Sequence, residues 1–397
     1  MPADRPPAPP VVDSASALAV ALAELRLAPI VTFDTEFHGE RSYWPKLMLL
    51  QVATPDTVWL FDPLSLDLRE VVHELARPGR VVIGHALRND LRILWQAYGA
   101  RFECVHDTQI AAAFLGCGLQ MGLGQLLQRT LKLHLPKGEQ MADWSQRPLP
   151  DKLRVYAAGD VAHLLEVYDQ QFETLQERGR ADWVRQECIA ICDPAQYDRD
   201  PATAGDRVTG ARKLEPADAG VLYALAELRE IMAQQEDLVP HFLVTDEALL
   251  ALTKLKPRHA KDVHGDRRLQ TRAIQRHAER WVQAVHAGLA KPLRRVPGRP
   301  PPPPELEAVA AAAMLLVGEL ANAESIAPQL LAKRDGLLDA LRESPVDIEA
   351  FADLAGLHGW RRELVAPQLW QWLSGDLALR CAADAAGGWR LAVGAAA

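Results

Sequence analysis

Four carboxylates are the residues of this sequence whose type and spacing most clearly indicate chemistry. Asp34 and Glu36 lie in VTFDTEF, Asp90 lies in GHALRNDLRIL, and Asp160 follows Tyr156 by four residues in YAAGDVAHLL. Acids that gather at one place repel one another unless a cation lies between them. Carboxylate oxygens are the ligands that Mg²⁺ and Mn²⁺ prefer. The sequence therefore predicts a metal site, which we expect to hold two hard divalent ions.

The first two acids are expected on a strand. Residues 29–37 are β-branched and apolar, which predicts a buried strand that ends in acids. Successive side chains of a strand point to opposite faces, so Asp34 and Glu36 share one face and Thr35 points the other way. Further strands are predicted near 45–53, 57–62 and 81–86, with helices near 14–27, 68–76, 89–98, 107–115 and 122–131.

The other two acids are expected on helices. Asp90 falls in the first turn of a helix that follows the strand near 81–86, where the helix dipole favours an acid even without a metal. From residue 151 to about 178 the pattern predicts one helix, on which Tyr156 and Asp160 share a face. Small and apolar residues flank Asp160, and a charged group in such a setting needs a partner.

Each of these features also has an ordinary structural explanation. An Asp-x-Glu pair at a strand end is usually a solvated loop, Asp90 resembles a common helix-start acid, and Tyr156 alone is more often a core residue. Only the order and context of all of them together favour the metal site.

The three segments resemble the three exonuclease motifs of the DEDD superfamily of 3′→5′ exonucleases. The motifs are Asp34-Thr35-Glu36, then Asp90, then Tyr156-x-x-x-Asp160, and tyrosine in the third motif marks the DEDDy branch. The strings DTEFHGERSYWPKLMLLQVAT, HDTQIAAAFLG and DWSQRPLPDKLRVYAAGDVAHLLEVY closely resemble the ribonuclease D family over residues 25–200. This resemblance implies an α/β ribonuclease H-like exonuclease domain, a mixed sheet flanked by helices, which we place at 14–200.

The resemblance also implies a mechanism, in which two ions (Mg²⁺ or Mn²⁺) serve an in-line displacement at phosphorus. Asp34 would bridge both ions, Glu36 and Asp160 would bind the ion on the side of the nucleophile, and Asp90 would hold the other through water. Tyr156, whose unperturbed pKa is about 10, would orient the attacking water rather than act as the main base. The expected activity is that of a 3′→5′ exoribonuclease that trims structured RNA, with tRNA precursors as the leading candidate, and releases nucleoside 5′-monophosphates. The alternatives are a DNA exonuclease of the same branch and an RNA-binding protein without catalysis.

Several neighbours of the acids are expected to contact the terminal nucleotide. Trp144 would offer a stacking platform and Arg147 a phosphate contact. Packing is the alternative for Phe37 and Trp144, and a hydrogen bond to a buried backbone carbonyl is the alternative for His85. The full set of expected substrate-binding residues is Thr35, Phe37, Gln51, His85, Asn89, Trp144 and Arg147.

The C-terminal half predicts helical domains. Residues 214–293 resemble an all-α HRDC domain, a helical bundle found in ribonuclease D and RecQ helicases, although Leu228 stands where that family often has tryptophan. Residues 305–375 resemble a second, more divergent HRDC domain. The remaining segments are expected to be a disordered N-terminus (1–13), a linker (201–213), a proline-rich linker (294–304) and a frayed tail (376–397).

A set of arginines in the first helical domain recurs every four residues, which predicts a basic stripe along one helix face. Like charges at this spacing repel each other, so we expect an RNA backbone to bind there. A solvated or internally ion-paired face is the alternative. The stripe comprises Arg268, Arg272, Arg276 and Arg280.

The composition agrees with an intracellular enzyme. The formal net charge of −8 does not exclude a nuclease, because nucleic-acid binding depends on local patches. The 5 cysteines have no zinc-ligand spacing and are expected to be reduced thiols. Neither a signal peptide nor a membrane span is expected, so we expect a cytoplasmic protein that binds RNA and needs no obligatory protein partner.

Overall fold

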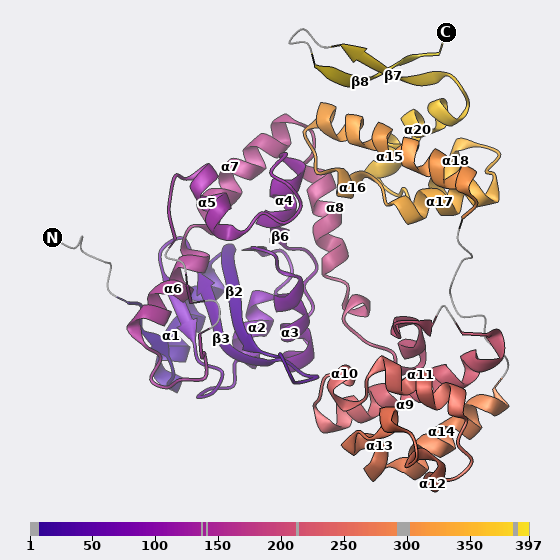
Figure 1. Ribbon diagram of the computed structural model, residues 1–397. Helices are drawn as coiled ribbons and strands as arrows, with labels where there is room; N and C mark the ends of the chain where they lie inside the picture. Colours follow the sequence, from indigo (N-terminus) through magenta and orange to yellow (C-terminus); the bar gives the residue numbers. More distant parts are fainter. Residues whose placement is uncertain are drawn as a thin grey trace.

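The computed structural model describes residues 8–135, 138–139, 142–211, 214–291, 302–383 and 388–396. Its first part is a six-stranded mixed sheet in the order β1-β4-β3-β2-β5-β6 (Figure 1). Strand β3 is antiparallel to both of its neighbours, whereas β1–β4, β2–β5 and β5–β6 are parallel pairs. The strands are β1 (Val11–Val12), β2 (Ile30–His38), β3 (Lys46–Ala53), β4 (Val58–Phe61), β5 (Val81–Gly84) and β6 (His106–Asp107).

Helices cover both faces of this sheet. One face of β2, with Val31 and Phe33, packs in a core with α1, α2 and α3, while Leu49 and Leu60 on the opposite face pack against α6. Because alternate residues face opposite ways, Asp34 and Glu36 lie on the α6 side. The helices are α1 (Ala15–Leu27), α2 (Arg69–Leu75), α3 (Arg88–Tyr98), α4 (Thr108–Phe114), α5 (Leu123–Thr130), α6 (Asp151–Ala162), α7 (Leu164–Glu177) and α8 (Ala181–Ile191).

The single helix predicted from 151 to 178 is wrong, because the chain forms two helices that break at His163. The backbone of His163 is not helical (φ −108°, ψ 1°). The hydroxyl of Thr32 donates to the carbonyl of Val161, which fixes the last turn of α6 on β2. Helix α6 then lies over β2, β3 and β4, and α7 lies over β2 and β5, so one straight helix does not follow the twisted sheet.

Three segments that were expected to lack structure are ordered. Val12 is buried in strand β1, so the disordered N-terminus does not extend to residue 13. The expected linker after residue 200 forms the 3₁₀ helix Pro201–Arg207, and Ala204 and Val208 are buried in the first helical core. The expected C-terminal tail forms the hairpin of β7 (Leu377–Ala383) and β8 (Trp389–Ala395). The expectations for 1–7, 212–213, 292–301, 384–387 and 397 lie outside the described residues.

The first helical domain has a core of its own. Long helix α9 packs against α11 and α14 around Leu222, Leu252 and Trp281. The short segment Arg267–Leu269 of this domain is a 3₁₀ helix. The α-helices are α9 (Pro216–Glu236), α10 (Pro240–Leu243), α11 (Asp246–Leu255), α12 (Ala260–Val263), α13 (Arg272–Arg276) and α14 (Ala278–Ala290).

The second helical domain packs directly on the α/β domain and shares its core (Figure 1). Trp360 stacks on Trp183 with ring centroids 5.1 Å apart, and Arg361 donates two hydrogen bonds to the carboxylate of Glu187. A partly buried ion pair between Arg180 and Glu324 (2.7 Å) adds to this interface. The helices are α15 (Pro304–Glu324), α16 (Pro328–Leu331), α17 (Arg334–Glu343), α18 (Ile348–Ala355), α19 (Trp360–Leu364) and α20 (Ala366–Leu373).

Helix α15 is long and apolar enough to cross a membrane, judged by length and composition alone. It instead packs on α16, α17 and α20, with Leu316, Val317 and Leu320 buried in the shared core. Core helices of ordinary domains pass the same test, so α15 does not argue for a membrane span.

Candidate active site

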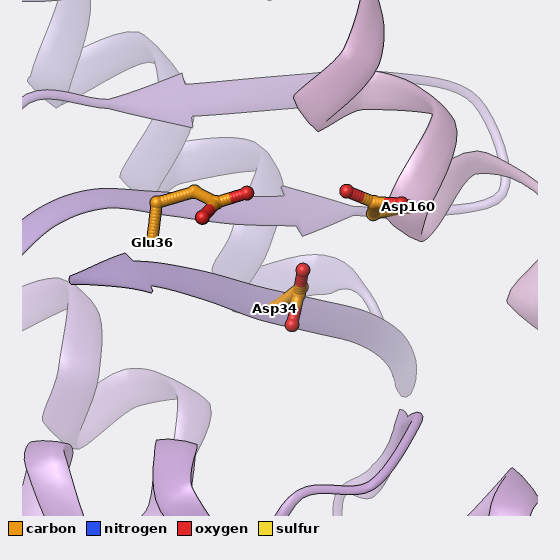
Figure 2. Close-up of side chains that lie close together, drawn as sticks. All are labelled: Asp34, Glu36 and Asp160. Atoms are coloured by element: carbon orange, nitrogen blue, oxygen red, sulfur yellow. The ribbon is translucent and has the colours of Figure 1, made fainter. Parts of the chain in front are cut away.

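Three carboxylates meet above the centre of the sheet. Asp34 and Glu36 come from β2 and Asp160 comes from α6, and one oxygen of each lies within 4.8 Å of the others. Figure 2 shows the three side chains turned toward a common space. A register shift between Glu36 and Phe37 marks an irregularity in β2 immediately beyond the acids. Such bulges are frequent next to active sites because they redirect a side chain.

Asp90 approaches from the opposite side of β2. Strand β5 ends at Gly84 and pairs only with the first part of β2, so the later part of β2 is open to the first turn of α3. There the hydroxyl of Thr35 donates a hydrogen bond to the Asp90 carboxylate. Thr35, predicted to bind substrate, is 5 % exposed and instead fixes the fourth acid. Asp90 is outside the cluster of three but near enough to raise the pKa of Glu36.

Burial and mutual repulsion hold protons on these acids when no cation is present. Burial, and then the charge of Asp160, raise the pKa of Asp34 to about 8. Burial together with the charges of the other three acids raises the pKa of Glu36 to about 9. Burial raises the pKa of Asp160 to about 7, and burial and the Asp34 charge raise that of Asp90. Two of these acids are buried and two are half-buried, and none has an ion pair with a basic side chain among the described residues. They are the donor set that a hard divalent cation would neutralise.

Tyr156 lies one helical turn before Asp160 on α6, and both residues line the same cavity. Trp144 lies against Tyr156 with ring centroids 6.1 Å apart. Trp144 is only 2 % exposed and packs among Leu49, Leu60 and Leu153. Packing, the alternative to a stacking platform, therefore describes Trp144, and its ring supports that of Tyr156.

Arg147 does not offer its guanidinium to a phosphate. It donates two hydrogen bonds to Asp62 at 2.7 Å each and further ones to the carbonyls of Met48 and Trp144. The Asp62 side chain is 1 % exposed and that of Arg147 is 25 % exposed, so a partly exposed arginine pairs with a buried carboxylate. Asp62, 85 residues away in sequence, already satisfies this arginine, which favours a structural role over the predicted phosphate contact.

The remaining predicted contacts divide into buried and accessible residues. His85 is bonded to the Thr108 hydroxyl and the Met121 carbonyl, as the structural alternative required, and Phe37 packs against the main core. Gln51 is fully buried opposite Asp34 on β3, and neither of its side-chain polar atoms has a partner within the described part of the chain. Asn89 is exposed at the start of α3.

The basic stripe does not lie on one helix. Arg268 is in a 3₁₀ helix and pairs with Asp266, Arg272 and Arg276 are in α13, and Arg280 is in α14. Thr271 caps α13 and His277, with non-helical backbone angles, ends it. All four arginines are exposed, but the four-residue repeat does not place them on a single face.

One wall of the cavity was missed by the sequence reasoning. The cavity, of about 580 Å³, is bordered by Tyr156 and Asp160 on α6 and by α5 and the chain after it on the other side. Polar side chains that repeat at helical spacing on α5, next to an apolar face, were the available signal. The exposed side chains of this wall are Gln125, Gln128, Arg129 and His134.

Comparisons with known proteins agree with this geometry. Residues 9–175 match the model of a 3′-5′ exonuclease family, and residues 218–285 match the HRDC domain. Ribonuclease D of Granulibacter bethesdensis is 32% identical over 382 residues, covering 94% of this chain and 95% of that protein. Ribonuclease D of Sphingobium indicum is 35% identical, covering 89% and 92% of the two chains.

The solved structure of Escherichia coli RNase D aligns with a TM-score of 0.81 and 26% identity over 92% of this chain and 98% of that one. The predicted α/β exonuclease domain followed by HRDC helices is thereby confirmed, as is the predicted exonuclease activity. The fold implies the use of divalent metal, and the acid cluster is suited to it. The chain belongs to the ribonuclease D family of 3′-5′ exoribonucleases.

Proposed function

We propose that this exoribonuclease trims the 3′ ends of tRNA precursors in the cytoplasm, with two Mg²⁺ or Mn²⁺ ions, and releases nucleoside 5′-monophosphates. The observation that carries the proposal is the convergence of Asp34, Glu36 and Asp160 beside Tyr156 at one end of an open cavity. The similarity to Escherichia coli RNase D, an exoribonuclease involved in structured RNA processing, supports structured RNA as the substrate.

Each residue of the site has a role in this proposal. Bound divalent ions supply Lewis acidity for displacement at phosphorus. Asp34, Glu36 and Asp160 would hold the ions through carboxylate oxygens, and Asp90, fixed by Thr35, would complete the set. Tyr156 would orient the attacking water from the cavity side of α6.

The helical domains provide the surface for the body of the RNA. The cavity beside the acids takes the single-stranded end, and a folded RNA extends beyond it. Exposed arginines of the first helical domain are suited to bind phosphates at a distance from the acids, and those we propose are Arg268, Arg272, Arg276 and Arg280.

A comparison of substrates tests the proposal. The purified protein should shorten a 3′-extended tRNA one nucleotide at a time in Mg²⁺ or Mn²⁺, and should act much more slowly on a DNA oligomer of the same sequence. EDTA should stop the reaction, and chromatography should identify nucleoside 5′-monophosphates. Activity that persists in EDTA would contradict the role of the acids as metal ligands. Faster degradation of the DNA oligomer would show that DNA, not RNA, is the substrate.

A separate prediction concerns the wall formed by α5. Arg129 is exposed at this wall of the cavity, with no hydrogen bond to its guanidinium among the described residues. Arg129→Gln should raise KM for a single-stranded RNA roughly five- to thirtyfold, because an exposed phosphate contact contributes about 1–2 kcal/mol. The kcat should change little. Arg101→Gln, an exposed arginine outside this cavity, is the control; equal effects of both changes would exclude a specific contact.

A further inference from the structure

The two helical domains are attached to the exonuclease domain in very different ways. The second shares one continuous core with it, through Trp360, Leu331 and their neighbours. The core of the first helical domain is separate, and Tyr43 is the exonuclease-domain residue that packs against it. Within the described ranges, every hydrogen bond between residues 14–191 and residues 214–291 involves the loop between β2 and β3. We call residues 39–45 the β2–β3 loop.

The β2–β3 loop forms hydrogen bonds with the end of α9 through both its side chains and its backbone. The Tyr43 hydroxyl donates to the buried Glu230 carboxylate (2.7 Å) and accepts from the Gln234 amide (3.0 Å). The Trp44 backbone N–H donates to Asp237 (2.9 Å), and its indole N–H donates to the Gln234 carbonyl (3.3 Å).

A fifth bond continues this contact beyond α9. The backbone N–H of Val239, at the start of α10, donates to the carbonyl of Arg41 at 3.1 Å. The ring of Tyr43 also meets that of Trp44 edge-on, with centroids 4.8 Å apart. Five hydrogen bonds on one loop therefore fix both position and rotation of the first helical domain.

The β2–β3 loop is directly continuous with the catalytic strand. Glu36 is on β2, seven residues before Tyr43, and β2 pairs with β3 up to His38 and Lys46. Inside the loop, Gly39 lies so close to Pro45 that an added Cβ would be 3.0 Å from the proline ring, so the turn is compact. A short, stiff connection thus links the metal-binding acids to the first helical domain.

We propose that the β2–β3 loop sets the position of the first helical domain relative to the acids, and that Tyr43 and Trp44 are positioning residues that determine the capture of structured RNA. The inference rests on the proposed function. A structured RNA must place its 3′ end at the acids and its body on the helical domain at the same time. When the distance between the acids and the first helical domain is fixed, an RNA bound at one of them is held at a high effective concentration near the other. A mobile domain lowers that effective concentration.

Kinetics of Tyr43→Phe test this role. The change keeps the aromatic ring and removes two hydrogen bonds. KM for an RNA hairpin with a 3′ single-stranded tail should rise roughly three- to tenfold. Both kcat on that substrate and the degradation of a five-nucleotide single strand should stay at the level of the parent. Tyr98→Phe, on α3 and half-buried in the exonuclease domain, is the matched control and should change neither.

Amide hydrogen exchange without RNA provides a second readout. In Tyr43→Phe the amides of Trp44 and Val239, both bonded across this contact, should exchange faster, with exchange in α6 unchanged. Unchanged exchange would show that the loop does not hold the domain, and faster exchange with unchanged KM would show that its position does not govern capture. An equal loss of activity on the hairpin and on the short single strand would show that Tyr43 affects the catalytic step instead. If the parent protein degraded no RNA, the proposed function would fail, while the exchange result would still report on the contact.

Discussion

Replacement of Asp34 by asparagine is expected to lower the rate of RNA degradation by roughly 10³-fold or more, the scale on which loss of one preorganised electrostatic group reduces turnover. Asp34 is central because its charge acts on both Glu36 and Asp90, and its carboxylate lies close to that of Asp160. An amide supplies one neutral oxygen where the carboxylate supplies two charged ones, so metal binding weakens as well. Single-turnover degradation of a labelled RNA, measured over a range of Mn²⁺ concentrations, separates the two effects.

The same variant should be more stable than the parent when metal is absent. The pKa of Asp34 is about 8 in the folded protein and 3.8 without perturbation, so the folded state retains a proton that the unfolded state has released. The contribution of Asp34 to the stability of the metal-free parent should therefore fall as pH rises from about 4 to about 8. Asparagine has no such proton, so the melting temperature of the variant in EDTA should exceed that of the parent at pH 8 and approach it at pH 4.

Addition of Mn²⁺ should reverse this order. Ions that bind only the folded parent raise its melting temperature, and the variant should respond weakly. Asp56→Asn, an exposed change in the turn before β4, is the control and should leave activity and both melting curves unchanged. A variant that is less stable than the parent in EDTA at pH 8 would show that the folded protein does not raise the pKa of Asp34.

Replacement of Arg147 by methionine is expected to lower the free energy of unfolding by about 3–5 kcal/mol, because it leaves a buried carboxylate without its partner. Burial alone would raise the pKa of Asp62, but hydrogen bonds from Arg147 and Ser65 outweigh it and hold the pKa below its usual value. Removal of the arginine also takes donors from the carbonyls of Met48 and Trp144. Urea unfolding followed by tryptophan fluorescence measures the loss.

A double variant distinguishes structure from substrate binding. Arg147→Met combined with Asp62→Asn should recover part of the lost stability, because the unpaired charge is gone. At low temperature, where Arg147→Met remains folded, its activity should match that of the parent. If Arg147→Met instead had normal stability and a raised KM, the result would support the phosphate contact that the sequence predicts.

Local patterns in the sequence determined the strands, most helices and the identity of the acids. The alternation of β2 placed Asp34 and Glu36 on one face, and helical spacing joined Tyr156 to Asp160, because both relations depend on backbone periodicity alone. The same periodicity misled where a helix ends: His277 separates α13 from α14, and the four-residue repeat of arginines does not survive that break.

Relations between distant segments were decided only by the tertiary structure. Thr35 holds Asp90 across α3 and β2, Asp62 takes the guanidinium of Arg147, and the environment of Trp144 is apolar core. The attachment of the first helical domain through Tyr43 had no sequence signal either. The same residue type can bind substrate or satisfy a buried polar partner. Which of the two it does depends on the residues that the fold packs next to it. The sequence by itself thus determined which bond this protein cleaves, and packing decided how the acids are held and where the first helical domain lies.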